Sequence, residues 1–141
     1  MKLGGVRNVI PEFQITLHSR DLLLLRKIHS FFGIGIVGER EDRNQVYYSV
    51  QSARAIVNVL IPHFERYPLI TQKRADYLLF KQAVNLLTQG QARSSFEGIR
   101  EIISLKGSMN KGLSDTLKLH FPDILLFPRP VVGEQSIQDP N

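Results

Sequence analysis

Polar and apolar residues alternate strictly along residues 12–18, where Phe13, Ile15 and Leu17 occupy the apolar positions. A period of two residues predicts a strand with one buried face and one polar face. The polar face of this strand carries one formal charge, at Glu12, and can lie open to solvent.

A helical pattern follows the strand. Ser19 is the predicted N-cap, and apolar residues recur at helical spacing from Leu24 to Phe32. Gly33 is suited to end the helix, because glycine readily adopts the left-handed conformation found there.

Two short strands are predicted at residues 34–39 and 46–51, on either side of a charged tip at residues 40–44. Together they form a hairpin with a solvated loop. In its second strand one face carries Val46, Tyr48 and Val50, and the other carries Tyr47, Ser49 and Gln51.

Helical patterns fill most of the remaining chain, at residues 53–65, 71–87, 94–107 and 114–122. The predicted caps are Ser52, Thr71, Ser94 or Ser95, and Ser114. Pro62 lies inside the first of these helices and should kink it or end it early. The order strand, helix, strand, strand and then helices is typical of an α+β fold.

Composition narrows the function only slightly. A chain of 141 residues fits one domain with a hydrophobic core, and the lack of cysteine excludes disulfides and thiol catalysis.

No apolar run approaches the ~20 residues that span a bilayer, so we expect no membrane partner. The start resembles neither a signal nor a transit peptide. The net charge of +5 weakly favours a polyanionic partner.

Common catalytic motifs are absent from the sequence: it contains no GxGxxG, Walker-type, GxSxG, HExxH or EF-hand pattern. We interpret His29 as a boundary residue of an apolar helix face and His63 as a packing or capping residue, with metal ligation as the alternative. The pair Glu41 and Asp42 is typical of a solvated hairpin tip, with cation binding as its alternative.

A polar sheet face with arginine at its rim fits the DNA major groove, which admits a two-stranded ribbon.

Residues 62–83 read PHFERYPLITQKRADYLLFKQA. They closely resemble the segment that joins the sheet to the long helix in single-chain LAGLIDADG homing endonucleases of fungal organellar introns. Three further pieces agree in order and spacing: FQITLH at 13–18, the hairpin at 34–51, and MNKGLSD at 109–115 with HFP at 120–122. The resemblance covers residues 10–123 and implies a homing-endonuclease-like half-domain, with a curved antiparallel sheet backed by helices.

The sequence lacks the helices that define this family. In the family each half opens with a LAGLIDADG helix whose final acidic residue binds the divalent metal. Only eleven residues precede Glu12, none of them acidic, and residues 136–141 resemble the lead-in to a second such helix. We therefore expect an N-terminal half without its first helix, and with the strand that follows that helix mostly lost. Its expected parts are a remnant segment at 1–9, a half-domain at 10–127 and an extended linker or tail at 128–141.

The missing acids bear on catalysis. Two-metal hydrolysis needs carboxylates that fix the ions and activate water. We expect no metal site in this chain and no DNA cleavage by the chain alone, while the intact enzyme would use Mg²⁺. A second half-domain or a second copy is expected to cover the sheet edge and the apolar helix faces.

The family lays its sheet in the DNA major groove, and the resemblance transfers this role by position. The implied DNA-facing residues are Gln14, Thr16, Ile36, Gly38, Arg40, Tyr47, Ser49 and Gln51. The alternation along the strands selects the same side. Arg43 at the tip, together with Arg7 and Asn8 near the start, could reach phosphates or bases. Basic residues of the family approach the scissile phosphate near Lys73, so Lys73 is the candidate for stabilising phosphate charge.

The sequence is also compatible with two other classes of function. A non-enzymatic protein on the same fold, such as a maturase that binds intron RNA, needs no metal-binding acids. A module whose sheet face docks protein is a third class. The resemblance to organellar intron enzymes implies a mitochondrial location.

Overall fold

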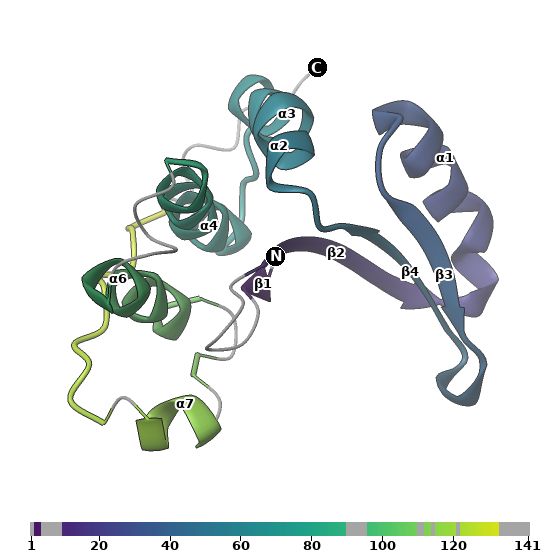
Figure 1. The fold of residues 1–141 in the computed structure, drawn as a ribbon. Coiled ribbons are helices and arrows are strands. Elements are labelled where there is room, and N and C mark those ends of the chain that lie inside the picture. Colours follow the sequence, from purple (N-terminus) through teal and green to yellow (C-terminus); the bar gives the residue numbers. More distant parts are fainter. Residues whose placement is uncertain are drawn as a thin grey trace. The chain divides into compact units, whose positions relative to one another are not determined.

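The computed structural model describes residues 2–3, 10–89, 96–109, 112–113, 115–120 and 122–132. The chain divides into two compact units, Met1–His63 and Phe64–Asn141. The first unit contains the strands and the second contains the long helices, which confirms the α+β fold (Figure 1). None of the helices described is long and apolar enough to cross a bilayer.

The sheet of the first unit is antiparallel, with the strand order β1–β2–β4–β3. Its strands are β1 (Lys2–Leu3), β2 (Pro11–His18), β3 (Ile36–Arg40) and β4 (Gln45–Val50). The three longer strands confirm the predictions to within two residues. No strand was predicted at residues 2–3, because a two-residue strand is too short to show alternation. β1 pairs only with the start of β2.

A short 3₁₀ turn, η1 (Ser19–Asp21), joins β2 to helix α1 (Leu22–Phe32). The prediction of Ser19 as the N-cap was wrong, because His18 caps this turn. Its ring Nδ1 accepts a hydrogen bond from the backbone N–H of Arg20 at 3.1 Å. The helix ends as predicted at Gly33, whose φ of +71° is a left-handed conformation that glycine adopts at little cost.

Tyr48, at the centre of β4, fixes α1 against the sheet. Its side chain is fully buried, and its hydroxyl donates a hydrogen bond to the carbonyl of Ile34 at 2.7 Å. The ring stacks against Phe32 of α1 and meets Phe13 of β2 edge-on. Burial raises the pKa of the Tyr48 phenol. The Tyr48 side of the sheet is therefore its covered face.

The predicted helix at 53–65 is present as three joined segments: α2 (Ala53–Ala55), the π-helical turn η3 (Ile56–Leu60) and α3 (Ile61–Arg66). Ser52 is its cap as predicted, since its Oγ accepts from the backbone N–H of Ala55 at 3.2 Å. Pro62 does not end the helix early. The π turn directly before it changes the backbone hydrogen-bond pattern where a proline would otherwise clash.

The second unit is helical where it is described. It contains α4 (Lys73–Thr88), α6 (Phe96–Gly107) and α7 (Asp115–His120), at the positions predicted. Thr71 contributes to the start of α4, because its Oγ1 accepts from the backbone N–H of Lys73 at 3.2 Å. The predicted caps Ser94, Ser95 and Ser114 lie outside the described residues. α4 and α6 contact each other and carry most of the buried residues of this unit.

A polar cluster links α3 to α4 in this unit. The Tyr77 hydroxyl donates a hydrogen bond to Glu65 at 2.8 Å, and Lys81 donates to the same carboxylate oxygen. The hydrogen bonds from Lys81 and Tyr77 hold the pKa of Glu65 below its usual value. Burial and the hydrogen bond to Glu65 raise the pKa of Tyr77. The cluster keeps Glu65 charged and ties the end of α3 to α4.

Residues 122–132 form an extended segment that binds along α6, and we call it the strap. The hydroxyl of Ser104 on α6 donates to the carbonyl of Leu125, and that of Ser108, just after the helix, donates to the carbonyl of Phe127. Gly107 makes room for the segment, since a Cβ at this position would lie 2.2 Å from the Leu126 side chain. The strap is thus fitted to the helix both by hydrogen bonds and by shape.

Arg129 anchors the end of the strap. Its guanidinium donates to Oδ1 of Asp76 at 2.6 Å, to the carbonyl of Ser108 at 2.8 Å and to the carbonyl of Gln72 at 3.0 Å. The Asp76 side chain is only 5% exposed, and Lys73 approaches its other oxygen at 3.6 Å. A buried carboxylate without a cationic partner is costly, so Arg129 compensates the burial of Asp76.

Replacing Arg129 should therefore destabilise the chain far more than replacing an arginine whose acidic partner is exposed. We expect Arg129→Met to lower the free energy of unfolding by about 3 kcal/mol, because it leaves Asp76 buried without its guanidinium. The control is Arg100→Met on α6, whose partner Asp123 is 74% exposed and which should lose at most about 1 kcal/mol. Urea unfolding at neutral pH measures both, and equal losses would contradict the anchoring role.

Candidate nucleic-acid interface

The strand register places the predicted DNA-facing residues side by side. Paired residues of an antiparallel sheet share a face. Three rows cross β2, β4 and β3 in that order: Gln14, Ser49 and Ile36; Thr16, Tyr47 and Gly38; His18, Gln45 and Arg40. Every strand residue named from the sequence as DNA-facing therefore lies on one side of the sheet, here called the open face.

Helix α1 does not cover the open face. It contacts β3 and β4 through the opposite, Tyr48 side. On the open face Thr16 and Gln51 are exposed, and Ile36 is 61% exposed. Contact of these residues with DNA stays a prediction, but the geometry that such contact needs is present.

Tyr47, Gly38 and Arg40 form a stacked group on this face. The Tyr47 ring lies across Gly38, where a Cβ would come within 2.3 Å of the ring. The guanidinium of Arg40 lies 4.7 Å from the centre of the same ring. A planar guanidinium stacks well on an aromatic face, and this contact restricts its orientation. The group holds a fork of N–H donors close to the open face before any ligand is bound.

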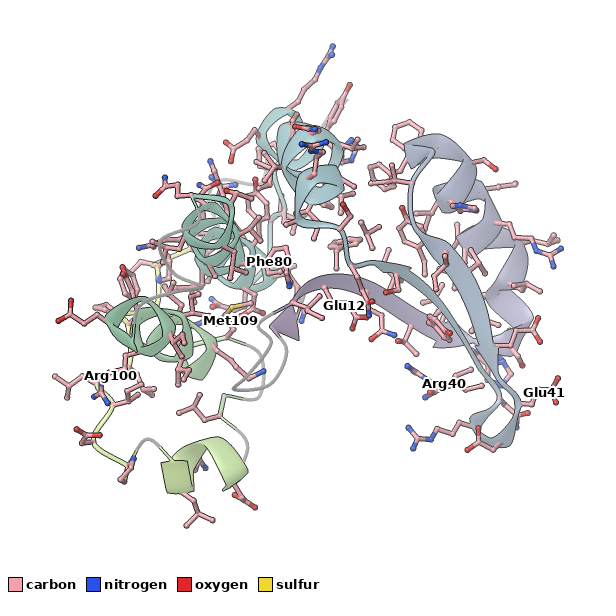
Figure 2. The ribbon with its side chains drawn as sticks, in the orientation of Figure 1. Glu12, Arg40, Glu41, Phe80, Arg100 and Met109 are labelled. Atoms are coloured by element: carbon pink, nitrogen blue, oxygen red, sulfur yellow. The ribbon has the colours of Figure 1, made fainter. Side chains whose placement is uncertain are left out.

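A second polar group involves Glu12, at the start of β2. Its Oε2 accepts a hydrogen bond from the Ser49 hydroxyl at 2.9 Å and one from the Gln51 amide at 2.7 Å. Ser49 is 4% exposed, so its hydroxyl is engaged inside the sheet surface. Gln51 is exposed and keeps a second N–H and its carbonyl oxygen. Figure 2 labels Glu12 and Arg40, which lie toward opposite ends of the open face.

On β2, β3 and β4, three residues of the open face were not among the predicted DNA-facing set: Glu12, His18 and Gln45. Strand alternation already assigned Glu12 and His18 to the polar side. The cross-strand pairing of Gln45 with His18 could not be read without the register. The interaction of Glu12 with Ser49 joins residues 37 positions apart, and no local pattern indicates it.

The remaining predicted residues lie outside the strands. Arg43 is in the 3₁₀ turn η2 (Glu41–Arg43) at the hairpin tip, where it pairs with Asp42 at 3.8 Å with both side chains exposed. Lys73 starts α4 in the second unit and its side chain is 63% exposed. Arg7 and Asn8 lie outside the described residues.

His29 and His63 pack against aromatic rings in the part of the chain described. His63 packs edge-on against the rings of Phe31 and Phe32, and His29 lies beside Tyr48. Within the same residues no group of three or more His, Cys, Asp or Glu gathers that could hold a metal ion. The described residues therefore do not fit the Mg²⁺ that the family resemblance implies.

Comparison with known proteins places the fold and the open face in context. A model of the LAGLIDADG endonuclease family matches residues 2–84. The probable intron-encoded endonuclease 3 of Neurospora crassa is 45% identical over 127 residues, which cover 89% of this chain and 24% of that protein. An uncharacterised protein in ND4 intron 1 of Podospora anserina is 43% identical over 81 residues, or 56% of this chain and 18% of that protein.

Solved structures agree with this match. The crystal structure of the I-SmaMI LAGLIDADG homing endonuclease bound to cleaved DNA superposes with a TM-score of 0.88 at 35% identity, covering 94% of this chain and 44% of that one. The chain thus spans about a quarter of the first relative and under half of the solved enzyme. The fold, the family model and the intron-encoded relatives together confirm the resemblance read from the sequence, and the chain belongs to the LAGLIDADG endonuclease family.

Proposed function

We propose that this chain binds double-stranded DNA as one half of a homing endonuclease, with its open face in the major groove. The observation that carries the proposal is the register, which brings the predicted DNA-facing strand residues together on the side that α1 leaves uncovered. Solved structures of the same fold include the homing endonuclease I-SmaMI bound to DNA, which supports the choice of ligand.

The chemistry of the open face suits base recognition. Arg40 presents a guanidinium that can pair bidentately with guanine, and the amides of Gln14 and Gln51 can pair with adenine. The exposed Ile36 offers an apolar contact of the kind that thymine methyl groups accept. Phosphate contacts would come from Arg43 at the tip and from Lys73 at the start of α4.

Cleavage is the part of the family activity that this chain does not supply by itself. Mg²⁺ in the intact enzyme needs carboxylates, and the described residues offer no cluster for it. We infer that the metal-binding acids and a second recognition surface come from another half-domain or a second copy. Lys73 would contribute charge stabilisation near a phosphate. The fungal, intron-encoded relatives support a mitochondrial location.

Binding is tested by titrating salt against duplex DNA and against a structured RNA of equal length. We expect duplex DNA to bind more tightly, with log K falling against log salt by about 0.9 for each phosphate contact. Preferential binding of structured RNA would instead favour a maturase-type role. No affinity for either at ~50 mM salt would point to a protein-docking role.

Arg40 should read one base pair rather than the backbone. We expect Arg40→Ala to cost about 1–3 kcal/mol on the preferred duplex and to relax the preference at a single position. Arg26→Ala is the matched control, because Arg26 is exposed on α1, which packs on the other side of the sheet. Selection from a randomised duplex pool measures both. A loss that is uniform across sequences would make Arg40 a phosphate contact.

Gly38 should matter through the stack that it supports. A methyl group at this position would displace the Tyr47 ring and so remove the platform of Arg40. We expect Gly38→Ala to weaken the same base preference as Arg40→Ala although the arginine is still present. Tyr47→Phe keeps the ring and should keep the preference. A Gly38→Ala variant that folds and selects the wild-type sequence would show that the stack is not used.

The chain alone should bind its preferred duplex without cutting it. We expect no nicking of a supercoiled plasmid carrying that sequence when Mg²⁺ is added, because the residues described gather no acidic cluster. Gel electrophoresis over several hours measures this, with a plasmid lacking the sequence as background. If Mg²⁺ led to nicking of the cognate plasmid but not of the background plasmid, the inference that this chain does not cleave DNA by itself would be overturned.

A further inference from the structure

We propose that Glu12 is a specificity-determining residue of the open face, selecting a base with an exocyclic amino group, and cytosine above all. The inference rests on the proposed DNA-binding function and deepens it. Its basis is the hydrogen-bonded group that Glu12 forms with Ser49 and Gln51. This group lies at one end of the open face, and Arg40 lies at the other end.

The carboxylate is held in one position. Both hydrogen bonds end on Oε2, from the Ser49 hydroxyl at 2.9 Å and the Gln51 amide at 2.7 Å. The two donors come from β4 and the residue that follows it, so they fix a β2 side chain from across the strand pair. A side chain held by two neighbours loses little further freedom when it meets a base.

The charge on Glu12 is unusual for a surface that meets a polyanion. The two hydrogen-bond partners of its carboxylate, a hydroxyl and an amide, are both uncharged. A carboxylate only accepts hydrogen bonds, so phosphates and base acceptors repel it. Glu12 therefore lowers the affinity of the chain for most DNA sequences. A DNA sequence that binds well has to place a hydrogen-bond donor opposite the Glu12 carboxylate.

Base-edge chemistry then selects the partner. In the major groove, donors are offered by cytosine N4 and adenine N6, while guanine and thymine present acceptors. Adenine also carries the N7 acceptor beside its amino group, which would face the carboxylate unfavourably. Cytosine has no such neighbour, so the Oε1 oxygen of Glu12 fits it best.

The strand geometry also sets the distance to the Arg40 position. Arg40 shares a row with His18, and Glu12 lies six residues before His18 along β2 (18 − 12). Six residues of antiparallel strand span roughly 20 Å, a length that corresponds to about six base-pair steps. The cytosine position should therefore lie about this far from the position that Arg40 reads.

The test is selection from a randomised duplex pool by the 141-residue chain and its Glu12→Gln and Glu12→Ala variants, without Mg²⁺. We expect the wild-type chain to enrich cytosine at one position about six base pairs from the Arg40-dependent one. Glu12→Gln is isosteric and adds a donor, so it should shift that position to adenine, changing the cytosine-to-adenine ratio at least tenfold. Glu12→Ala should lose the preference there and keep it at the Arg40 position.

Ser49→Ala provides the control for a purely structural role. It removes one of the two donors but keeps the carboxylate, so cytosine should remain the selected base with a weaker enrichment. Arg26→Ala, on helix α1, is a second control, since it should leave the selected base unchanged. Unfolding midpoints confirm that each variant is folded.

The outcomes separate this inference from the proposed function. Duplex binding with identical base preference in Glu12→Gln and wild type would overturn the role of Glu12 and leave the DNA-binding function standing. Failure of the wild-type chain to bind any duplex would overturn both.

Discussion

The position of β4 between β2 and β3 is the constraint on which the candidate interface depends. Side chains alternate along a strand, so a slip of one residue would exchange the two faces of β4. Tyr48 opposes such a slip, because its buried ring packs between α1 and β2 and its hydroxyl bonds to Ile34. The polar neighbours of Tyr48 are therefore held on the side of the sheet opposite α1.

The open face combines two opposite chemistries. The stacked guanidinium of Arg40 at one end attracts hydrogen-bond acceptors, and the carboxylate of Glu12 at the other end repels them. Attraction to phosphate is largely indifferent to sequence, whereas a misplaced charge penalises wrong partners. The modest net charge of +5 is consistent with a surface that gains selectivity by including an acid.

Periodicity was sufficient to predict the three longer strands and most helices, because their residues interact over short stretches of sequence. Residues 12–18 alternate strictly, and the hairpin follows from two short runs around a charged tip. The cap at His18 was missed because an imidazole ring replaced the expected serine hydroxyl. Pro62 was judged by its effect on an ordinary α-helix, whereas the chain uses a π turn before it.

The candidate site could be predicted as a set of residues but not as an arrangement. Alternation assigned Gln14, Tyr47 and Gln51 to one side, yet it said nothing of which side chains touch. The bonds from Ser49 and Gln51 to Glu12 depend on cross-strand register. Asp76 and Arg129 are 53 positions apart, and their pairing requires the tertiary fold.

That last pairing has a consequence for how the protein is made. A ribosome delivers the chain from its amino end, so α4 leaves the exit tunnel well before the strap does. Until residue 129 emerges, the carboxylate of Asp76 lacks the guanidinium that offsets its burial, and the early packing of α4 on α6 is incomplete. The strands of the sheet pair with one another within residues 2–50, so these pairings do not wait for later sequence. Folding of the nascent chain would thus begin with the sheet unit and end with the helical unit.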